Sequence, residues 1–208
     1  MEIGANLYKN LSLSAVLLLF LSSVLVGCST EETAESTEAI ESVEPAEQEA
    51  GVDESEEAIR SVIEKEFNGP DETYRNLWNV MADKQPVDPN QEEYDAFLES
   101  AEYTDLMDYM EDSYAEYFTE NGYDNFSRSG AFNYSFSERE YQLSTSDIDI
   151  VQSDNGEKLY SFTFKVWYEP ADGEAAEYEF EGRAIAPEEG KIGKVDFHDK
   201  DQLIEDIR

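Results

Sequence analysis

Residues 160–184, YSFTFKVWYEPADGEAAEYEFEGRA, contain the pattern that decides the fold. Apolar side chains occupy every second position before Asp172-Gly173 and again after it, which predicts two half-buried strands joined by a turn. One face of this pair carries Tyr160, Phe162, Phe164, Val166, Tyr168, Tyr178, Phe180, Gly182 and Ala184. The opposite face of the second strand is charged from Glu177 to Arg183. The stretch therefore predicts an antiparallel hairpin with one face on the core and the other in solvent.

The alternation continues on both sides of this hairpin. Asn155-Gly156, the strongest short hairpin signal, precedes it, and Glu189-Gly190 turns the chain into a last strand. The apolar phase of that last strand slips at Gly193, which predicts a bulge. An earlier strand is predicted where apolar and polar residues alternate through Phe132, Tyr134 and Phe136. The C-terminal half thus reads as a meander of adjacent strands.

Helical spacing dominates the residues before the meander. Apolar residues follow it over residues 58–67, and Asn68-Gly69-Pro70 predicts where that helix stops. Asp71 is expected to cap a second helix, which is broken by two prolines and followed by a short helix around residue 97. A longer helix is expected to end at Asn121-Gly122, and a last short one lies at residues 203–207. Helices first and strands second predict an α+β domain, in which helices pack on one face of a curved antiparallel meander sheet.

The N-terminus has the layout of an export signal. Residues 11–26 are apolar and uncharged, but sixteen residues fall short of the about 20 that a membrane span needs. The run ends in Leu25-Val26-Gly27-Cys28, which resembles the lipobox of bacterial lipoproteins. The resemblance implies cleavage between Gly27 and Cys28, and acyl chains such as palmitate on the Cys28 thiol. The alternative is an ordinary signal peptide followed by a structural cysteine.

The residues after Cys28 have the composition of a disordered tether. Residues 29–57 contain 12 Asp and Glu, no Lys or Arg, and almost no large apolar side chain. Such a segment buries too little surface to offset the entropy of ordering. The predicted organisation is a signal peptide at 1–27, a lipidated cysteine and acidic linker at 28–57, and one domain at 58–208. A partner-binding acidic segment is the alternative for the linker.

Charge and composition restrict the partners of the chain. The formal net charge is −36, which opposes binding to nucleic acid and favours a cationic protein or a small ligand as partner. The chain has one cysteine, so an internal disulfide and a Cys-rich zinc site are excluded. No motif for a cofactor or a metal is present, and none is predicted. The lipid bilayer is the partner expected from Cys28, which places the domain at the extracytoplasmic face of the cell membrane.

The last three predicted strands resemble those of the nuclear-transport-factor-2-like superfamily, whose domain is a cystatin-like cone of sheet closed by helices. The resemblance rests on Gly182-Arg183-Ala184-Ile185, and on Glu189-Gly190-Lys191-Ile192 with Val195 and Phe197. It implies a pocket between sheet and helices. Members of this superfamily include isomerases, cyclases and dehydratases as well as non-catalytic binding modules, so the fold alone does not give a function.

Inward tyrosines are the candidate lining of such a pocket. Their rings and hydroxyls suit ligand binding, although core packing is the alternative explanation. The candidates are Tyr134, Tyr160, Tyr168 and Tyr178.

No catalytic residue is predicted. His198, the only histidine, is expected to be solvated at a strand end rather than to act as a general base. Asp147, Asp149 and Asp154 could supply oxygen ligands to calcium, but a solvated face explains them better. The sequence therefore predicts a lipid-anchored, non-catalytic binding or accessory domain. The alternative hypothesis is an isomerase- or cyclase-like enzyme that uses a carboxylate in its pocket.

Overall fold

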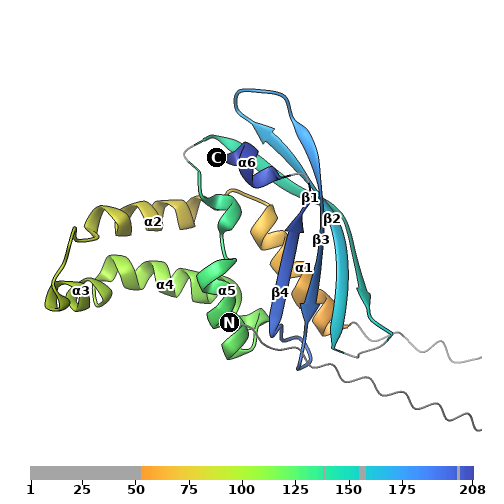
Figure 1. Cartoon of the computed structure of the whole chain (residues 1–208), viewed down its shortest axis with the longest axis horizontal. Helices are drawn as coiled ribbons and strands as arrows, with labels where there is room; N and C mark the ends of the chain where they lie inside the picture. Colours follow the sequence, from red (N-terminus) through yellow and green to blue (C-terminus); the bar gives the residue numbers. More distant parts are fainter. Residues whose placement is uncertain (1–52, 138, 155–157, 201) are drawn as a thin grey trace, which may run out of the picture. The chain divides into compact units, whose positions relative to one another are not determined.

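A four-stranded antiparallel sheet and six α-helices make up the domain in the computed structural model, which describes residues 53–137, 139–154, 158–200 and 202–208. The strands are β1 (Tyr141–Gln152), β2 (Leu159–Pro170), β3 (Ala176–Ile185) and β4 (Lys194–Asp199), and they pair in the order β1-β2-β3-β4 (Figure 1). The predicted α+β class and the meander are confirmed. The predicted signal peptide, Cys28 and the linker up to residue 52 lie outside the described residues.

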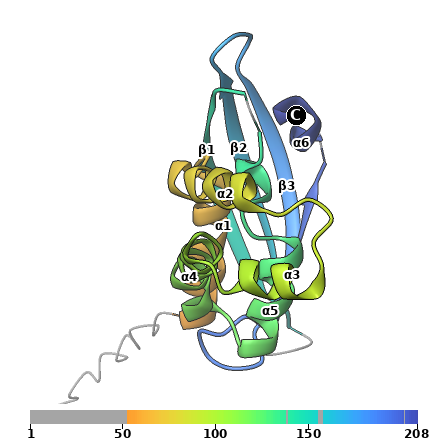
Figure 2. The ribbon, with the colours of Figure 1, turned by 90° about the vertical axis from the view of Figure 1, so that its left-hand side faces the viewer.

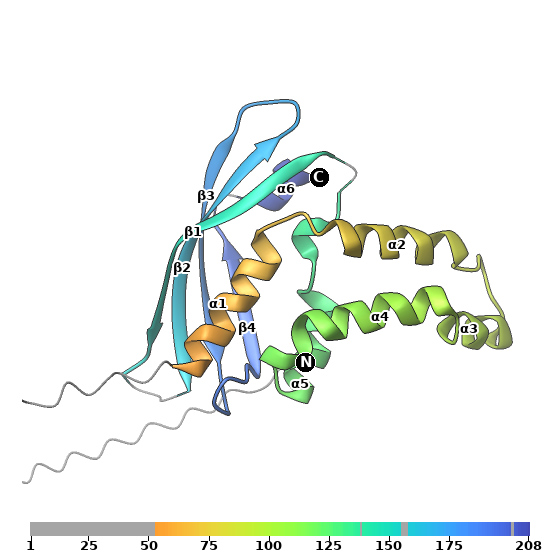
Figure 3. The ribbon, with the colours of Figure 1, turned by 180° about the vertical axis from the view of Figure 1, so that it is seen from behind.

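The helices fall into two groups. α1 (Glu54–Phe67) packs against the curved sheet, and α6 (Leu203–Ile207) lies near its upper end (Figure 1). α2 (Glu72–Lys84), α3 (Gln91–Leu98) and α4 (Ala101–Tyr114) form an arm that extends away from the sheet (Figures 1 and 3) and is seen end-on in Figure 2. The chain returns through the 3-10 turn η1 (Ala115–Tyr117), α5 (Glu120–Ser129) and the 3-10 turn η2 (Asn133–Ser135). The other face of the sheet, here called the outer face, carries no helix among the described residues.

Aromatic rings fill the space between α1 and the inner face of the sheet. Phe67, at the end of α1, lies 4.4 Å from Tyr134, 4.8 Å from Phe180, 4.9 Å from Phe164 and 5.2 Å from Phe197, measured between ring centroids. Tilted and edge-on pairs of this kind contribute about 0.5–1.5 kcal/mol each beyond the burial of their surface. The core is therefore a packed cluster of rings around Phe67.

The first helix begins before the predicted boundary of the domain. The Asp53 carboxylate accepts hydrogen bonds from the backbone N–H groups of Ser55 (2.9 Å) and Glu56 (3.1 Å), so it caps α1 at Glu54. Acidic residues in the first turn also favour the positive end of the helix dipole. Residues 54–57, predicted as linker, thus belong to the folded domain.

The strand predicted through Phe132, Tyr134 and Phe136 is wrong. Phe132 has a left-handed backbone (φ 58°), and the next residues form η2. The three aromatic residues do not share one strand face: Phe132 is buried in the core, Tyr134 packs against the core, and Phe136 is 37% exposed.

The glycine at 122 does not end a helix, contrary to the prediction. α4 ends at Tyr114, and Asn121-Gly122 lies in the first turn of α5, which Thr119 caps. A Cβ atom at Gly122 would lie 2.4 Å from the carbonyl oxygen of Ile192. The glycine is there because another segment of backbone passes close to it.

The bulge predicted at Gly193 is also misplaced. Gly193 precedes β4, and its neighbour Ile192 forms a bridge with Phe118 instead of extending the strand. The register shift lies in β1, between Ser146 and Asp149, where Asp147 has a positive φ of 52°. The chain pairs β1 with β2 as predicted, although Asn155-Gly156 itself lies outside the described residues.

Candidate functional site

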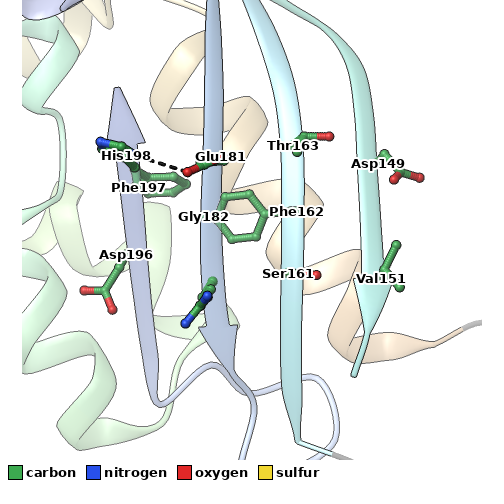
Figure 4. A pocket seen from close by; sticks show the side chains of 11 residues that line it. Asp149, Val151, Ser161, Phe162, Thr163, Glu181, Gly182, Asp196, Phe197 and His198 are labelled. Carbon is green, nitrogen blue, oxygen red and sulfur yellow. Dashed lines mark hydrogen bonds and ion pairs between the residues drawn. The ribbon is translucent and has the colours of Figure 1, made fainter. Parts of the chain in front are cut away.

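A hollow of about 440 Å³ opens on the outer face of the sheet, across all four strands (Figure 4). We call it the outer-face hollow. It is lined by Asp149, Val151, Ser161, Phe162, Thr163, Glu181, Gly182, Arg183, Asp196, Phe197 and His198.

The strand register explains why the face is hollowed here. One cross-strand row runs Asp149, Thr163, Glu181 and His198, and the next runs Val151, Ser161, Arg183 and Asp196. The β2 member of each row is small, while Glu181 and Arg183 on β3 and His198 on β4 are longer. Ser161 and Thr163 therefore form the floor, and the charged side chains form the rim.

Gly182 lies between the two rows. In Figure 4 the rings of Phe162 and Phe197 lie on either side of it, and their centroids are 5.6 Å apart. A Cβ atom at Gly182 would come within 2.3 Å of the Phe162 ring and 2.4 Å of the Asp196 carbonyl oxygen. Only glycine permits this close approach of ring and backbone.

Two side chains hold the carboxylate of Glu181 at one side of the rim. Lys200 Nζ lies 2.9 Å from its Oε2 atom, and His198 Nδ1 lies 3.2 Å from Oε1. The hydrogen bond from Lys200, followed by that from His198, lowers the pKa of Glu181. Glu181 therefore stays ionised and paired.

Other polar groups of the hollow are available to a ligand. The side chains of Asp149, Ser161, Thr163 and Arg183 have no hydrogen-bond or ion-pair partner among the described residues. Asp149 stands on β1 and Arg183 on β3, with the two hydroxyls of β2 between them. The hollow thus offers a carboxylate, two hydroxyls and a guanidinium in sequence across three strands.

The structure does not bring the four candidate tyrosines together. Tyr160 donates its hydroxyl hydrogen bond to the Asp53 carboxylate (3.0 Å) at the start of α1. Tyr168 and Tyr178 donate theirs to Asp206 in α6, at 3.2 Å to the carbonyl oxygen and 2.6 Å to the carboxylate. Tyr134 packs on Phe67 and lines a separate groove of about 300 Å³ between α5 and β4. Three of the four hydroxyls are therefore bonded within the chain.

A buried acid, Glu66, was not identified from the sequence. Its side chain is 2% exposed, and Oε2 accepts hydrogen bonds from the Tyr114 hydroxyl (2.9 Å) and the Phe132 N–H (2.7 Å). The Tyr134 N–H approaches Oε1 at 3.4 Å. Its position in the sequence does indicate burial, because Glu66 continues the apolar stripe of α1 one turn after Val62 and Ile63.

The bonds of Glu66 hold η2 in place. They satisfy the backbone N–H groups of Phe132, whose backbone is left-handed, and of Tyr134. Glu66 is not among the residues that line the outer-face hollow. Its geometry gives it a structural role in joining α1, α4 and η2.

His198 is placed unfavourably for nucleophilic catalysis. It is exposed on β4, and Glu181 stands between it and the hydroxyl of Thr163 in the cross-strand row. A nucleophile–histidine–acid arrangement needs the histidine in the middle. Here the acid lies between the imidazole and the hydroxyl, so the three groups are in the wrong order for a catalytic triad.

The acids considered for calcium do not share a site. Asp147 pairs with Lys165 (3.4 Å), Asp149 lines the hollow, and Asp154 is exposed. In the described part of the chain, no group of three or more His, Cys, Asp or Glu side chains is arranged to hold a metal ion. Over the same residues, no helix has the length and apolar character to cross a bilayer.

Comparisons with protein-family models, curated proteins and solved structures found no match for this chain.

Proposed function

We propose that this chain is a bacterial lipoprotein, anchored through Cys28 at the extracytoplasmic face of the cell membrane. Its domain binds a polar partner in the outer-face hollow without transforming it. The anchoring rests on Leu25-Val26-Gly27-Cys28 and the apolar run before it. Two acyl chains give the stable anchoring that a single chain does not.

One observation carries the binding role. The outer-face hollow keeps four polar side chains without partners in the described structure, whereas the hydroxyls of Tyr160, Tyr168 and Tyr178 are bonded within the chain. A ligand with a cationic group would meet Asp149, and a carboxylate on the same ligand would meet Arg183 bidentately. The volume is within the range of small-molecule sites. A zwitterionic molecule or a short charged peptide segment fits this arrangement best.

The alternative function, an isomerase- or cyclase-like enzyme, requires a tuned acid that faces the ligand. Glu66 is the buried acid that favours this alternative, because burial raises its pKa to about 8. Its oxygens, however, are bonded to Tyr114 and Phe132, and the hollow lies on the other face of the sheet. Binding without turnover therefore accounts for more of the geometry.

Photo-crosslinking in intact cells tests the binding role. A photoreactive amino acid in place of Val151, on the rim of the hollow, is expected to give an adduct that mass spectrometry assigns to a small molecule or a peptide. The same amino acid in place of Ala82, an exposed residue of α2, is the matched control and is expected to give none.

Charge reversal then distinguishes specific binding from chance proximity. Asp149→Lys and Arg183→Glu are each expected to lower the adduct yield at position 151 at least tenfold, while Lys84→Glu leaves it unchanged. Equal yields at positions 151 and 82, or yields that neither reversal affects, would contradict the proposed site.

A further inference from the structure

A second recess, of about 310 Å³, opens where α2 meets the segment after η2. Its lining shares no residue with the outer-face hollow. Tyr74 and Trp78 of α2 and Phe136 supply its aromatic surface, and Arg75 and Asn79 supply polar groups. We call it the aromatic recess.

Contacts from the core hold the aromatic surface rigid. Phe132 is buried and stacks on Tyr74, with ring centroids 4.1 Å apart and planes 5° apart. Phe136 then meets Tyr74 edge-on at 5.3 Å and Trp78 edge-on at 4.7 Å, with interplanar angles of 86°. Trp78 and Phe136 are each 37% exposed. Two perpendicular rings thus form an open corner, fixed in advance by a chain of contacts that starts in the core.

The polar groups restrict the charge of a ligand in this corner. The Arg75 guanidinium lies 5.0 Å from the Tyr141 ring centroid and is held by Ser135 O (2.8 Å) and Glu72 Oε1 (3.2 Å). Because Glu72 offsets the charge of Arg75, the recess offers an organic cation no unpaired carboxylate, and the guanidinium lies beside the rings that would otherwise attract such a cation. The net charge of −36 and the nearby Glu72 disfavour an anion. A neutral ligand is left.

The lining also distinguishes a hydroxylated ligand from an aliphatic one. The Asn79 side chain has no hydrogen-bond partner among the residues that the structure describes. An aliphatic ligand would cover this amide without bonding it, and an unpaired buried polar group costs free energy. A ligand ring with one apolar face and hydroxyls at its edge can stack on the aromatic side chains and hydrogen-bond to the Asn79 amide.

We propose that the aromatic recess binds a sugar ring of a neutral saccharide, stacked on Trp78 against Phe136 and hydrogen-bonded at its edge by Asn79 and Arg75. The sugar belongs either to a free saccharide or to a glycan chain, and both have the same ring chemistry. This site is independent of the outer-face hollow and does not rest on the function proposed for it.

Tryptophan fluorescence tests the proposal, because the chain has two tryptophans, Trp78 and Trp167. Trp167→Phe leaves Trp78 as the only indole emitter in the full chain. The probes are tri-N-acetylchitotriose, cellotriose, N-acetylglucosamine, tetramethylammonium and hexanoate. We expect a saturable shift of the Trp78 emission with at least one saccharide and none with the cation or the fatty acid.

Variants in the Trp167→Phe background assign the shift to the recess. Asn79→Ala and Phe136→Ala are each expected to weaken saccharide binding at least fivefold, and Val80→Ala, an exposed change on the same helix, leaves it unchanged. Melting curves show whether each variant is folded, and Asn79→Ala changes no packed side chain. Saturation by a trisaccharide but not by its monosaccharide points to a glycan chain, and equal saturation points to a free sugar. No shift with any saccharide, or an equal shift with tetramethylammonium or hexanoate, overturns the proposal.

Discussion

Gly182→Ala is expected to lower the free energy of unfolding by about 3 kcal/mol, at the upper end of the range for overpacking. The added methyl group would lie 2.3 Å from the Phe162 ring and 2.4 Å from the Asp196 carbonyl oxygen. Phe162 is buried against Phe164 and Phe197, so its ring has little room to withdraw. The backbone of β4 must shift instead, which changes the rim of the outer-face hollow. For a chain of this size the melting temperature should fall by roughly 10 °C.

Two further variants identify the cause of this loss. Ser161→Ala, on the outer face of the neighbouring strand, is expected to change the melting temperature by less than 2 °C. Combining Gly182→Ala with Phe162→Leu should cost less than the sum of the two single changes, because the smaller side chain makes room for the methyl group. Strict additivity, or a melting temperature of Gly182→Ala within 2 °C of the wild type, would show that the Phe162 ring and the Asp196 carbonyl do not crowd Gly182.

Stability is expected to fall with rising pH between about 4.5 and 8 because of Glu66. Burial raises the pKa of this carboxyl from 4.5 to about 8, although hydrogen bonds from the Phe132 N–H and the Tyr114 hydroxyl act in the opposite direction. The folded chain therefore binds a proton that the unfolded chain releases in this pH range. Its stabilising contribution is complete below the unfolded pKa and is lost as the pH passes the folded pKa. The loss is on the order of 1.4 kcal/mol per pH unit, and roughly 5 kcal/mol in all.

Glu66→Gln isolates this effect from the other acids of the chain. The variant keeps an acceptor for Tyr114 and Phe132 but does not titrate, so the wild type should lose stability relative to the variant as the pH rises. Denaturant unfolding at pH 5, 6.5 and 8 measures it. Glu64→Gln, an exposed change on the same helix, should follow the wild type at every pH. A difference between wild type and Glu66→Gln that is constant with pH would mean that Glu66 is ionised throughout.

The sheet could be predicted from sequence because its signals are local and redundant. Each inward side chain from Tyr160 to Ala184 repeats the same period of two, and Asp172-Gly173 joins the strands through a turn whose glycine has φ 139°. The segment around Phe132 could not be predicted in the same way. Its left-handed backbone depends on Glu66, which is 66 residues away in the sequence. Alternation alone does not distinguish such a turn from a strand.

Glycines were ambiguous for a similar reason. Gly122 was predicted to end a helix, yet it lies inside α5 because the Ile192 carbonyl passes beside it. The residue type signals a special backbone or a close approach, and only the tertiary structure shows which of the two applies.

The candidate site shows the limit of sequence periodicity. The phase of the strands correctly placed Tyr160, Tyr168 and Tyr178 on the inner face, but their partners Asp53 and Asp206 come from segments distant in the sequence. The outer-face hollow depends on how four strands align, since Ser161 and Thr163 form a floor only beside longer side chains on β3 and β4. No single stretch of sequence contains that alignment.

Metabolic labelling with palmitate tests most directly that this chain acts as a membrane-anchored lipoprotein. Cells that express the wild type, Cys28→Ala or, as a control, Thr33→Ala are labelled, fractionated, and the purified proteins compared. We predict label and membrane association for the wild type and Thr33→Ala, and an unlabelled product for Cys28→Ala that is either unprocessed or released. Equal labelling of the wild type and Cys28→Ala, or no label on any of the three, would contradict the proposed anchoring.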